Sequence, residues 1–258
     1  MNSIDIPIQN LFLGSIILII PIIIFQYYRA GLAREMLMSF ARMTLQLAFV
    51  GFYMTYIFNL NNIWLNFAWV SIMVIAAGIS IIRRSGLKSR IFVLPVVAGV
   101  LSDVIINILT YTLLIMSYRE FFNARYMIPI LGMVIGNCIT NSIIGIKSFY
   151  SNIQKDERRY QYMLVAGYSR DEALRPFISD ALKISFAPTI ASNATIGLIW
   201  LPGMMTGQIL GGADPLSAVK YQLLIVSSIF VGSVATVFVS LNLLKRYSFD
   251  EYDNLLIK

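Results

Sequence analysis

The amino-acid sequence predicts an all-α fold, a polytopic membrane helix bundle of about seven transmembrane helices. Its 258 residues are 58% hydrophobic and only 13% charged, and the mean hydropathy is +0.74. A soluble domain carries about 25% charged residues, so this composition excludes a soluble fold. Long charge-free stretches also match the roughly 20 apolar residues that one span requires. We expect residues 1–258 to form a single transmembrane domain.

The limits of the spans follow from the polar residues that interrupt the apolar sequence. Asn59, Asn61 and Asn62 predict a polar turn between the second and third spans, and Asp103 is the only charge within the fourth. The first span lacks a basic start and a small-residue cleavage site, so we expect it to be retained. The predicted spans cover residues 8–28, 43–60, 63–82, 91–117, 126–147, 184–201 and 221–243.

The distribution of lysine and arginine predicts the orientation. With these spans, 17 of the 20 basic residues lie on one side, and only Arg119, Arg125 and Lys220 lie on the other. The basic side is expected to be cytoplasmic. The N-terminus of this cell-membrane protein is then predicted to lie outside the cell and the C-terminus in the cytoplasm. The net charge of +7 then follows from this topology. Membrane lipid is an expected partner of the chain, and no nucleic-acid partner is expected.

One loop on the basic side, about residues 148–183, is long enough to meet a partner protein. The sequence of this loop predicts a helix over 156–166 that ends at Gly167, and a second helix that begins with a capping box of Ser169 and Glu172. Pro176 predicts a short helix, a kink and a further helix entering the membrane. The loop either lies on lipid headgroups or docks into another protein. Its mixed charge favours a protein, because lipid-surface helices usually have a basic polar face.

Polar residues inside the spans are candidates for a transport pathway. Asp103 is the only acid placed within a span, and Asn107 lies on the same helix face. A buried carboxylate is costly, so Asp103 is expected to face protein or water, or to be protonated. Interhelical hydrogen bonding is the alternative role for such residues. The candidate pathway comprises Asp103, Asn107, Asn137, Cys138, Asn141 and Asn193.

The segment after the sixth span carries glycine at every fourth position. Gly203, Gly207 and Gly211 would share one face of a helix, which allows another backbone to approach closely. Pro202 suits the first turn of a new short helix. The charge count places this helix on the outer side, as a gate or re-entrant helix packed against the fifth span or a second copy.

Three further side chains in this segment, Met204, Met205 and Gln208, belong to the same packing or gate candidate. A thioether can bind a soft metal, but methionine more often fills gaps in a packed interior. The sequence contains no histidine, the commonest metal ligand. A tight metal site is therefore not expected, and the metal ligands stay unknown.

Sequence signatures of enzymes are missing. The chain has no phosphate-binding loop, no H-E-x-x-H and no G-x-S-x-G motif, so catalytic residues are not expected. Its one cysteine excludes an intramolecular disulfide. We expect no cofactor in this chain; if the protein uses ATP, another chain must supply the ATPase, with its ATP and Mg²⁺.

Three blocks of the sequence carry a resemblance to a known family. The blocks are Leu201–Gly212 with Asp214-Pro215 and Tyr221-Gln222, Arg125–Met133 with Gly136-Asn137, and Ala166–Ala173. Together they resemble the FetB-type permease family, the membrane subunits of ATP-binding-cassette half-transporters. The most specific block is the long glycine-containing one, and the resemblance covers residues 40 to 245 approximately.

The resemblance implies a permease that acts as a homodimer and is driven by a separate ATPase. Bacterial members are linked to iron export, and plant relatives to aluminium tolerance with a nucleotide sugar proposed as cargo. The family's coupling role carries over to Gly167, Glu172 and Ala173, beside Ser169. We therefore expect export of a metal such as iron. Another cargo, a secondary transporter or channel that uses Asp103, and a non-transporting scaffold are the alternatives.

Overall fold

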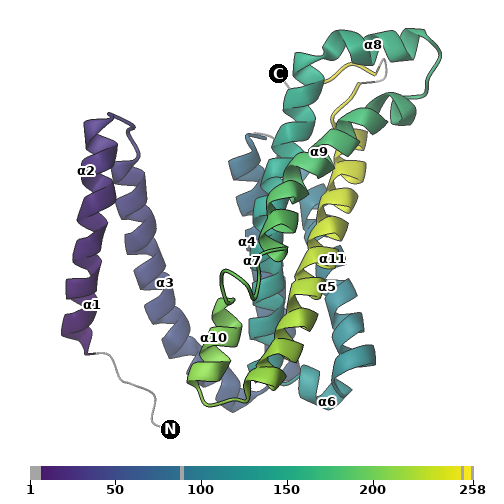
Figure 1. The fold of residues 1–258 in the computed structure, drawn as a ribbon. Helices are drawn as coiled ribbons and strands as arrows, with labels where there is room; N and C mark the ends of the chain where they lie inside the picture. The colour runs from purple at the N-terminus through teal and green to yellow at the C-terminus, as the bar shows by residue number, and fades with distance from the viewer. Residues whose placement is uncertain (1–6, 88–89, 251–252, 257–258) are drawn as a thin grey trace. The chain divides into compact units, whose positions relative to one another are not determined.

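The computed structural model describes residues 7–87, 90–250 and 253–256. Within these residues the regular elements are helical, and two isolated β-bridges, Ile196 with Trp200 and Phe249 with Leu255, are the only strand-like pairings. The described chain divides into two compact units, Met1–Asn61 with Leu210–Gly212, and Asn62–Ile209 with Ala213–Lys258. Figure 1 labels the helices.

The first unit consists of apolar helices with exposed side chains. They are α1 (Ile8–Ser15), η1 (Ile16–Leu18), α2 (Ile19–Tyr27) and α3 (Ala33–Leu60). Leu45 and Phe52 on α3 are 73% and 84% exposed, which would be costly in water. A helix surface of this kind fits a membrane environment.

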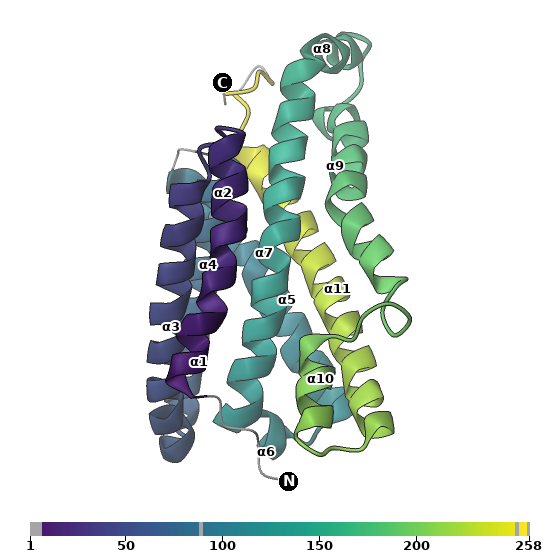
Figure 2. The same cartoon turned by 60° about the vertical axis from the view of Figure 1, so that its left-hand side comes forward.

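The second unit is built around long helices whose apolar faces meet in one core. These are α4 (Ile63–Ser85), α5 (Val93–Thr110), α7 (Ala124–Lys155), α9 (Arg170–Asn193) and α11 (Pro215–Tyr247). Figure 2 shows them running along one another. The short elements are η2 (Arg90–Phe92), the π-helical η3 (Tyr111–Ile115), α6 (Tyr118–Phe121), α8 (Glu157–Val165) and α10 (Gly203–Leu210).

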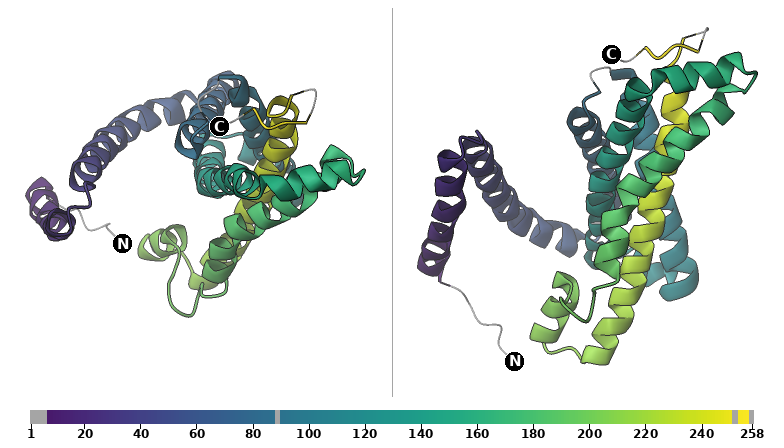
Figure 3. Two further views of the ribbon diagram at one scale, coloured as in Figure 1. Left: turned by 90° about the horizontal axis from the view of Figure 1, so that it is seen from above. Right: turned by 45° about the horizontal axis from the view of Figure 1, so that its top comes forward.

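The short helices mark the two ends of this unit. In Figures 1 and 3, α8 lies across the end at which α7 finishes and α9 begins. Helices α6 and α10 lie at the opposite end. By the charge distribution, α8 is at the predicted cytoplasmic end and α10 at the predicted outer end.

The predicted helical membrane fold is confirmed. Among the residues that the structure describes, five helical stretches are long and apolar enough to cross a membrane: Ala33–Leu60, Ile63–Ser85, Val93–Ile115, Ala124–Lys155 and Pro215–Tyr247. The first predicted span corresponds to a shorter apolar helix, Leu13–Tyr27. The sixth, predicted at 184–201, corresponds to the second half of α9, which ends at Asn193 before a series of turns. The count of seven spans stays a prediction.

Most of the local signals act as expected. Asn62 caps α4 by accepting a hydrogen bond from the backbone N–H of Trp64 at 2.9 Å, and Asn61 takes the left-handed conformation that ends α3. Helix α9, however, continues through Pro176, so the two predicted segments form one helix. The proline removes a single backbone donor, while burial of Leu174 and Phe177 on either side stabilises the uninterrupted helix.

Candidate functional site

A cavity of about 450 Å³ lies between α7, α9, α11 and the start of α10. Its polar lining comes from amides and hydroxyls, and its apolar lining includes two methionine thioethers. None of the described residues that line it carries a charge. The polar or aromatic residues are Asn137, Thr140, Asn141, Thr189, Ser192, Asn193, Trp200, Gln222 and Phe230; the others are Met133, Ile144, Pro188, Ile196, Pro202, Gly203, Met204, Val226 and Ile229.

Hydrogen bonds between helices α7 and α9 fix one wall of the cavity. Ser185 Oγ donates to the backbone oxygen of Asn141 at 2.6 Å, and Thr189 Oγ1 donates to Asn141 Oδ1 at 3.2 Å. Asn137 donates its Nδ2 to the carbonyl of Met133 in its own helix at 2.8 Å. The amide oxygen of Asn137 and its second N–H can therefore be offered to a ligand.

Gln222, which the sequence analysis did not select, lines the same cavity from the first turns of α11. It is 8% exposed, and its Oε1 has no hydrogen-bond partner among the described residues. A buried amide oxygen without a partner costs about 1–3 kcal/mol. The sequence carried a signal for this residue, since an uncharged polar side chain stands at the start of an apolar span.

The other half of the predicted pathway lies in the protein interior, away from the cavity lining. Asp103, Asn107 and Cys138 are at most 1% exposed. Asn107 Nδ2 donates to Asp103 Oδ1 at 2.7 Å and to the Asp103 carbonyl at 2.9 Å. The Cys138 thiol lies beside the Asp103 carboxyl and donates to the carbonyl of Ile135 at 3.1 Å. Asp103 thus faces protein, one of the expected outcomes.

Small residues bring α5 and α11 together at this buried cluster. A Cβ atom placed on Gly232 would overlap the Asp103 carboxylate, and one placed on Gly99 would overlap Ser240 Oγ. Glycine therefore permits the close approach of the two helices. Of the six predicted pathway residues, the structure brings Asn137, Asn141 and Asn193 to the cavity, and their role in transport stays a prediction.

The glycine-containing segment forms the expected short helix, α10. Gly203 and Met204 contact the cavity, Met205 is buried, and Gln208 Oε1 has no hydrogen-bond partner among the described residues. A Cβ on Gly203 or Gly207 would meet no atom within 4 Å. Gly211 follows the helix in a turn. Gly203 and Gly207 therefore leave α10 free of close contacts at these two positions, and the packing of this face against the fifth span or a second copy stays a prediction.

At the other end of the unit, α8 and the first turns of α9 form a compact element, here called the α8–α9 hairpin. Gly167 follows α8 with a φ of +92°, as its predicted capping role requires. Ser169 and Glu172 form the predicted capping box, in which Glu172 Oε2 accepts from Ser169 Oγ at 2.7 Å and Ser169 N at 2.9 Å. These bonds lower the pKa of Glu172. Ala173 is fully buried.

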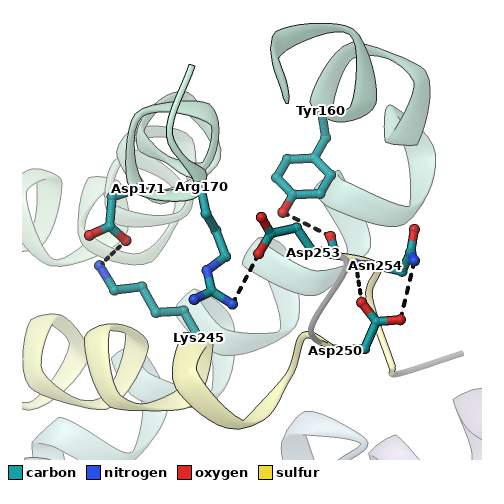
Figure 4. Close-up of polar contacts among 7 residues, drawn as sticks. All are labelled: Tyr160, Arg170, Asp171, Lys245, Asp250, Asp253 and Asn254. Carbon is teal, nitrogen blue, oxygen red and sulfur yellow. Dashed lines mark hydrogen bonds and ion pairs between the residues drawn. The ribbon is translucent and has the colours of Figure 1, made fainter. Parts of the chain in front are cut away.

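The C-terminal tail, residues 248–250 and 253–256, holds this hairpin against α11 (Figure 4). Tyr160 donates its hydroxyl to the carbonyl of Asp253 at 3.0 Å, and Arg170 pairs with the Asp253 carboxylate at 3.1 Å. Lys245 of α11 pairs with Asp171 at 2.8 Å. The hydrogen bond from Lys245 lowers the pKa of Asp171, and burial raises the pKa of Tyr160 to about 12.

The sequence analysis missed this tail. Phe249 is 6% exposed and its ring lies 5.6 Å from that of Tyr160, while Ser248 and Tyr150 share a 2.5 Å hydrogen bond. Acidic residues after α11, facing a loop rich in arginine, were the available signal. The tail joins the hairpin to a helix that also lines the cavity.

Comparison with known proteins decides the family. The model of an uncharacterised protein family, UPF0014, matches residues 8–249. The chain belongs to this family. No solved structure matches it. Relatives in this family are named as UPF0014 membrane proteins, and the predicted resemblance to FetB and to the plant aluminium-related proteins is confirmed.

Several named relatives in this family resemble the chain over most of its length. The UPF0014 membrane protein YjkA of Bacillus subtilis is 33% identical, over 88% of this chain and 89% of its own. FetB of Escherichia coli K12, described as a probable iron export permease protein, is 29% identical, over 87% and 85%. The protein ALUMINUM SENSITIVE 3 of Arabidopsis thaliana is 33% identical, over 84% and 78%. These names support a multi-pass membrane permease.

Proposed function

We propose that the chain is the permease subunit of an ATP-binding-cassette transporter that exports a metal such as iron. A separate ATPase would bind ATP and Mg²⁺, and two copies of the permease would form the working transporter. The name of the FetB relative supports the choice of cargo. The single structural observation that carries the proposal is the folded α8–α9 hairpin, which is joined to a cavity-lining helix.

The length of α7 favours a protein, rather than a lipid surface, as the partner of this hairpin. Its 32 residues extend about 48 Å at 1.5 Å per residue. The hydrocarbon core of a bilayer is about 30 Å thick, so roughly 18 Å of helix remains to be distributed beyond it. If the span follows residues 126–147, most of this excess raises α8 away from the membrane.

The tip of the hairpin offers an apolar surface to such a partner. Tyr162, Val165 and Tyr168 are exposed there, and Val165 is 89% exposed. The nearby acids Asp156 and Asp171 are paired within the chain, whereas Arg158 and Arg175 have no ion-pair partner among the described residues. An ATPase surface with an apolar socket and an acidic rim would complement this tip.

The four predicted coupling residues would then act mainly by shaping the tip. Gly167 permits the left-handed turn, and the reciprocal bonds of Ser169 and Glu172 begin α9 at a fixed position. Ala173 anchors the first turn in the core. In this proposal Tyr162, Val165 and Tyr168 make the contact itself, and motion of the ATPase reaches α11 through the C-terminal tail.

Co-purification with the cognate ATPase tests the proposal. The change of both Val165 and Tyr168 to serine should abolish capture of the ATPase by the tagged permease, because it removes the apolar tip. Leu198→Ser is the matched control, since Leu198 is also 89% exposed but follows α9 at the other end. In proteoliposomes, the wild-type pair should move Fe²⁺ only when ATP is supplied.

Two results would overturn this assignment. Fe²⁺ transport without ATP would favour a secondary transporter or channel. Failure of the wild-type chain to capture any ATPase would remove the basis for coupling. A secondary transporter driven by Asp103 finds little support in the structure, because this carboxylate is buried beside Gly232 and does not line the cavity.

A further inference from the structure

We propose that Gln222 is a cargo-contacting residue and that the cavity between α7, α9 and α11 accepts a divalent cation through neutral side-chain oxygens. The inference rests on the proposed function for its choice of a metal cargo. It goes further by naming the contacting atoms and the charge class that the cavity selects.

The first argument is the unsatisfied oxygen of Gln222. Its side chain is more than nine-tenths buried, it lines the cavity, and its Oε1 lacks a hydrogen-bond partner among the described residues. Buried polar atoms are normally paired, so an unpaired amide oxygen on a side chain that lines a cavity points to a ligand that supplies the missing interaction. Either a cation or a hydrogen-bond donor would do so. Gln222 Oε1 is itself shielded from solvent, so the side-chain amide would turn toward the cavity to reach that ligand.

The second argument is the chemistry of the surrounding wall. Asn137 on α7 and Asn193 on α9 line the cavity together with Gln222, and their amide oxygens are candidate cation ligands, with Met204 nearby. Asn141 Oδ1 already accepts a hydrogen bond from Thr189 and would offer its second lone pair. Neutral carbonyl oxygens coordinate cations in proteins. They bind more weakly than carboxylates would, which suits a transit site from which the ion must also leave.

The third argument is the absence of positive charge. No lysine or arginine is among the described residues that line the cavity. Phosphate and carboxylate groups are usually recognised by arginine, lysine or helix N-terminal amides. Of these groups, the cavity offers the backbone amides at the start of α10 but no basic side chain. A nucleotide sugar would therefore bury most of the charge of its diphosphate without compensation, whereas a hydrated or partly dehydrated cation would meet amide oxygens from α7, α9 and α11.

A negative charge introduced at residue 222 should change the binding affinity in opposite directions for a cationic and an anionic cargo. Gln222→Glu keeps the shape and introduces a carboxylate. At a water-like dielectric and a separation of about 4 Å, Coulomb's law gives a divalent cation about a thirtyfold gain in affinity. An anionic cargo would instead be repelled. Gln222→Leu, which removes the oxygen, should weaken cation binding several-fold.

The experiment titrates the purified permease–ATPase complex with Co²⁺, whose absorption spectrum reports its ligands, and separately with a nucleotide sugar. Asn242→Asp is the matched control, because it makes the same amide-to-carboxylate change on α11, where the Asn242 amide bonds to its own helix outside the cavity lining. We expect tighter Co²⁺ binding for Gln222→Glu, weaker binding for Gln222→Leu and no change for Asn242→Asp.

Unchanged or weakened Co²⁺ binding by Gln222→Glu overturns the inference, as does an equal gain in Asn242→Asp. Saturable binding of the nucleotide sugar that Gln222→Glu weakens would assign the cavity to an anion instead. These failures differ from failure of the proposed function. ATP-driven Fe²⁺ transport that is indifferent to Gln222 refutes only the inference, while a Gln222-dependent Co²⁺ site without ATP-driven transport refutes only the proposed function.

Discussion

Substitution of Gly232 by alanine tests where the structure places Asp103. The added Cβ would overlap the Asp103 carboxylate and approach Asn107 Nδ2 to 2.9 Å. Both side chains are held by their mutual hydrogen bonds and by burial, so they cannot simply swing aside. Overpacking of a close-packed interior costs about 1–3 kcal/mol, and loss of the Asp103–Asn107 hydrogen bond would add about 1 kcal/mol. We expect a total destabilisation of about 2–4 kcal/mol.

Denaturation of the purified permease in mixed micelles measures this effect. Gly136→Ala is the control, because a Cβ on Gly136 in α7 would meet no atom within 4 Å; it should be neutral or slightly stabilising. A second substitution, Asp103→Ala, should make room for the methyl group and recover part of the loss caused by Gly232→Ala. If Gly232→Ala were as stable as the wild type, the close packing of α5 against α11 at Asp103 would be refuted.

Three further changes test the ends of the molecule. Ser169→Ala should destabilise the hairpin by about 1 kcal/mol through loss of the cap. Because the pKa of Glu172 is lowered, the stabilisation by the cap should be present near neutral pH and lost as the pH falls through that pKa. Hydrogen exchange of α9 would reveal this loss, and a hairpin whose stability does not change with pH would contradict it. Tyr160→Phe should weaken the attachment of the C-terminal tail by about 0.5–1.5 kcal/mol, measured by proteolysis after α11. Because the pKa of Tyr160 is raised to about 12 from about 10, the wild-type hydrogen bond should persist below about pH 10 and be lost above about 12. Equal cleavage of the two proteins would contradict a role of this bond in holding the tail. Gly207→Leu should block assembly of two copies or transport without affecting ATPase capture, because its open face lies on α10; loss of capture instead would mean that α10 only supports the fold.

Features that depend on a few neighbouring residues were predictable from the sequence. The capping box needs only Ser169 and Glu172, the end of α8 needs Gly167, and the polar turn between α3 and α4 needs Asn61 and Asn62. Each satisfies backbone groups within its own turn. The membrane character is equally accessible, because it is a property of long apolar stretches rather than of contacts between them.

The division of the polar residues into two groups could not be predicted in the same way. Asn137 and Cys138 are adjacent in the sequence, yet one lines the cavity and the other lies beside Asp103 in the interior. About 100° of rotation around α7 separates neighbouring residues. The sequence gives the faces of a helix but not which neighbour each face meets, and here that depends on the approach of α5 and α11 at Gly232.

Helix α11 connects these separate features, which supports a mechanical role for it. Its first turns carry Gln222 at the cavity, Gly232 packs on the buried Asp103, and Lys245 pairs with the α8–α9 hairpin. The 23 residues from Gln222 to Lys245 extend about 35 Å, roughly the thickness of the hydrocarbon core. A packed helix of this length moves largely as one body, so displacement of the hairpin by an ATPase would reach the cavity through α11. The close contact at Gly232 would then guide that movement, because α11 cannot slide there without displacing the Asp103 and Asn107 side chains.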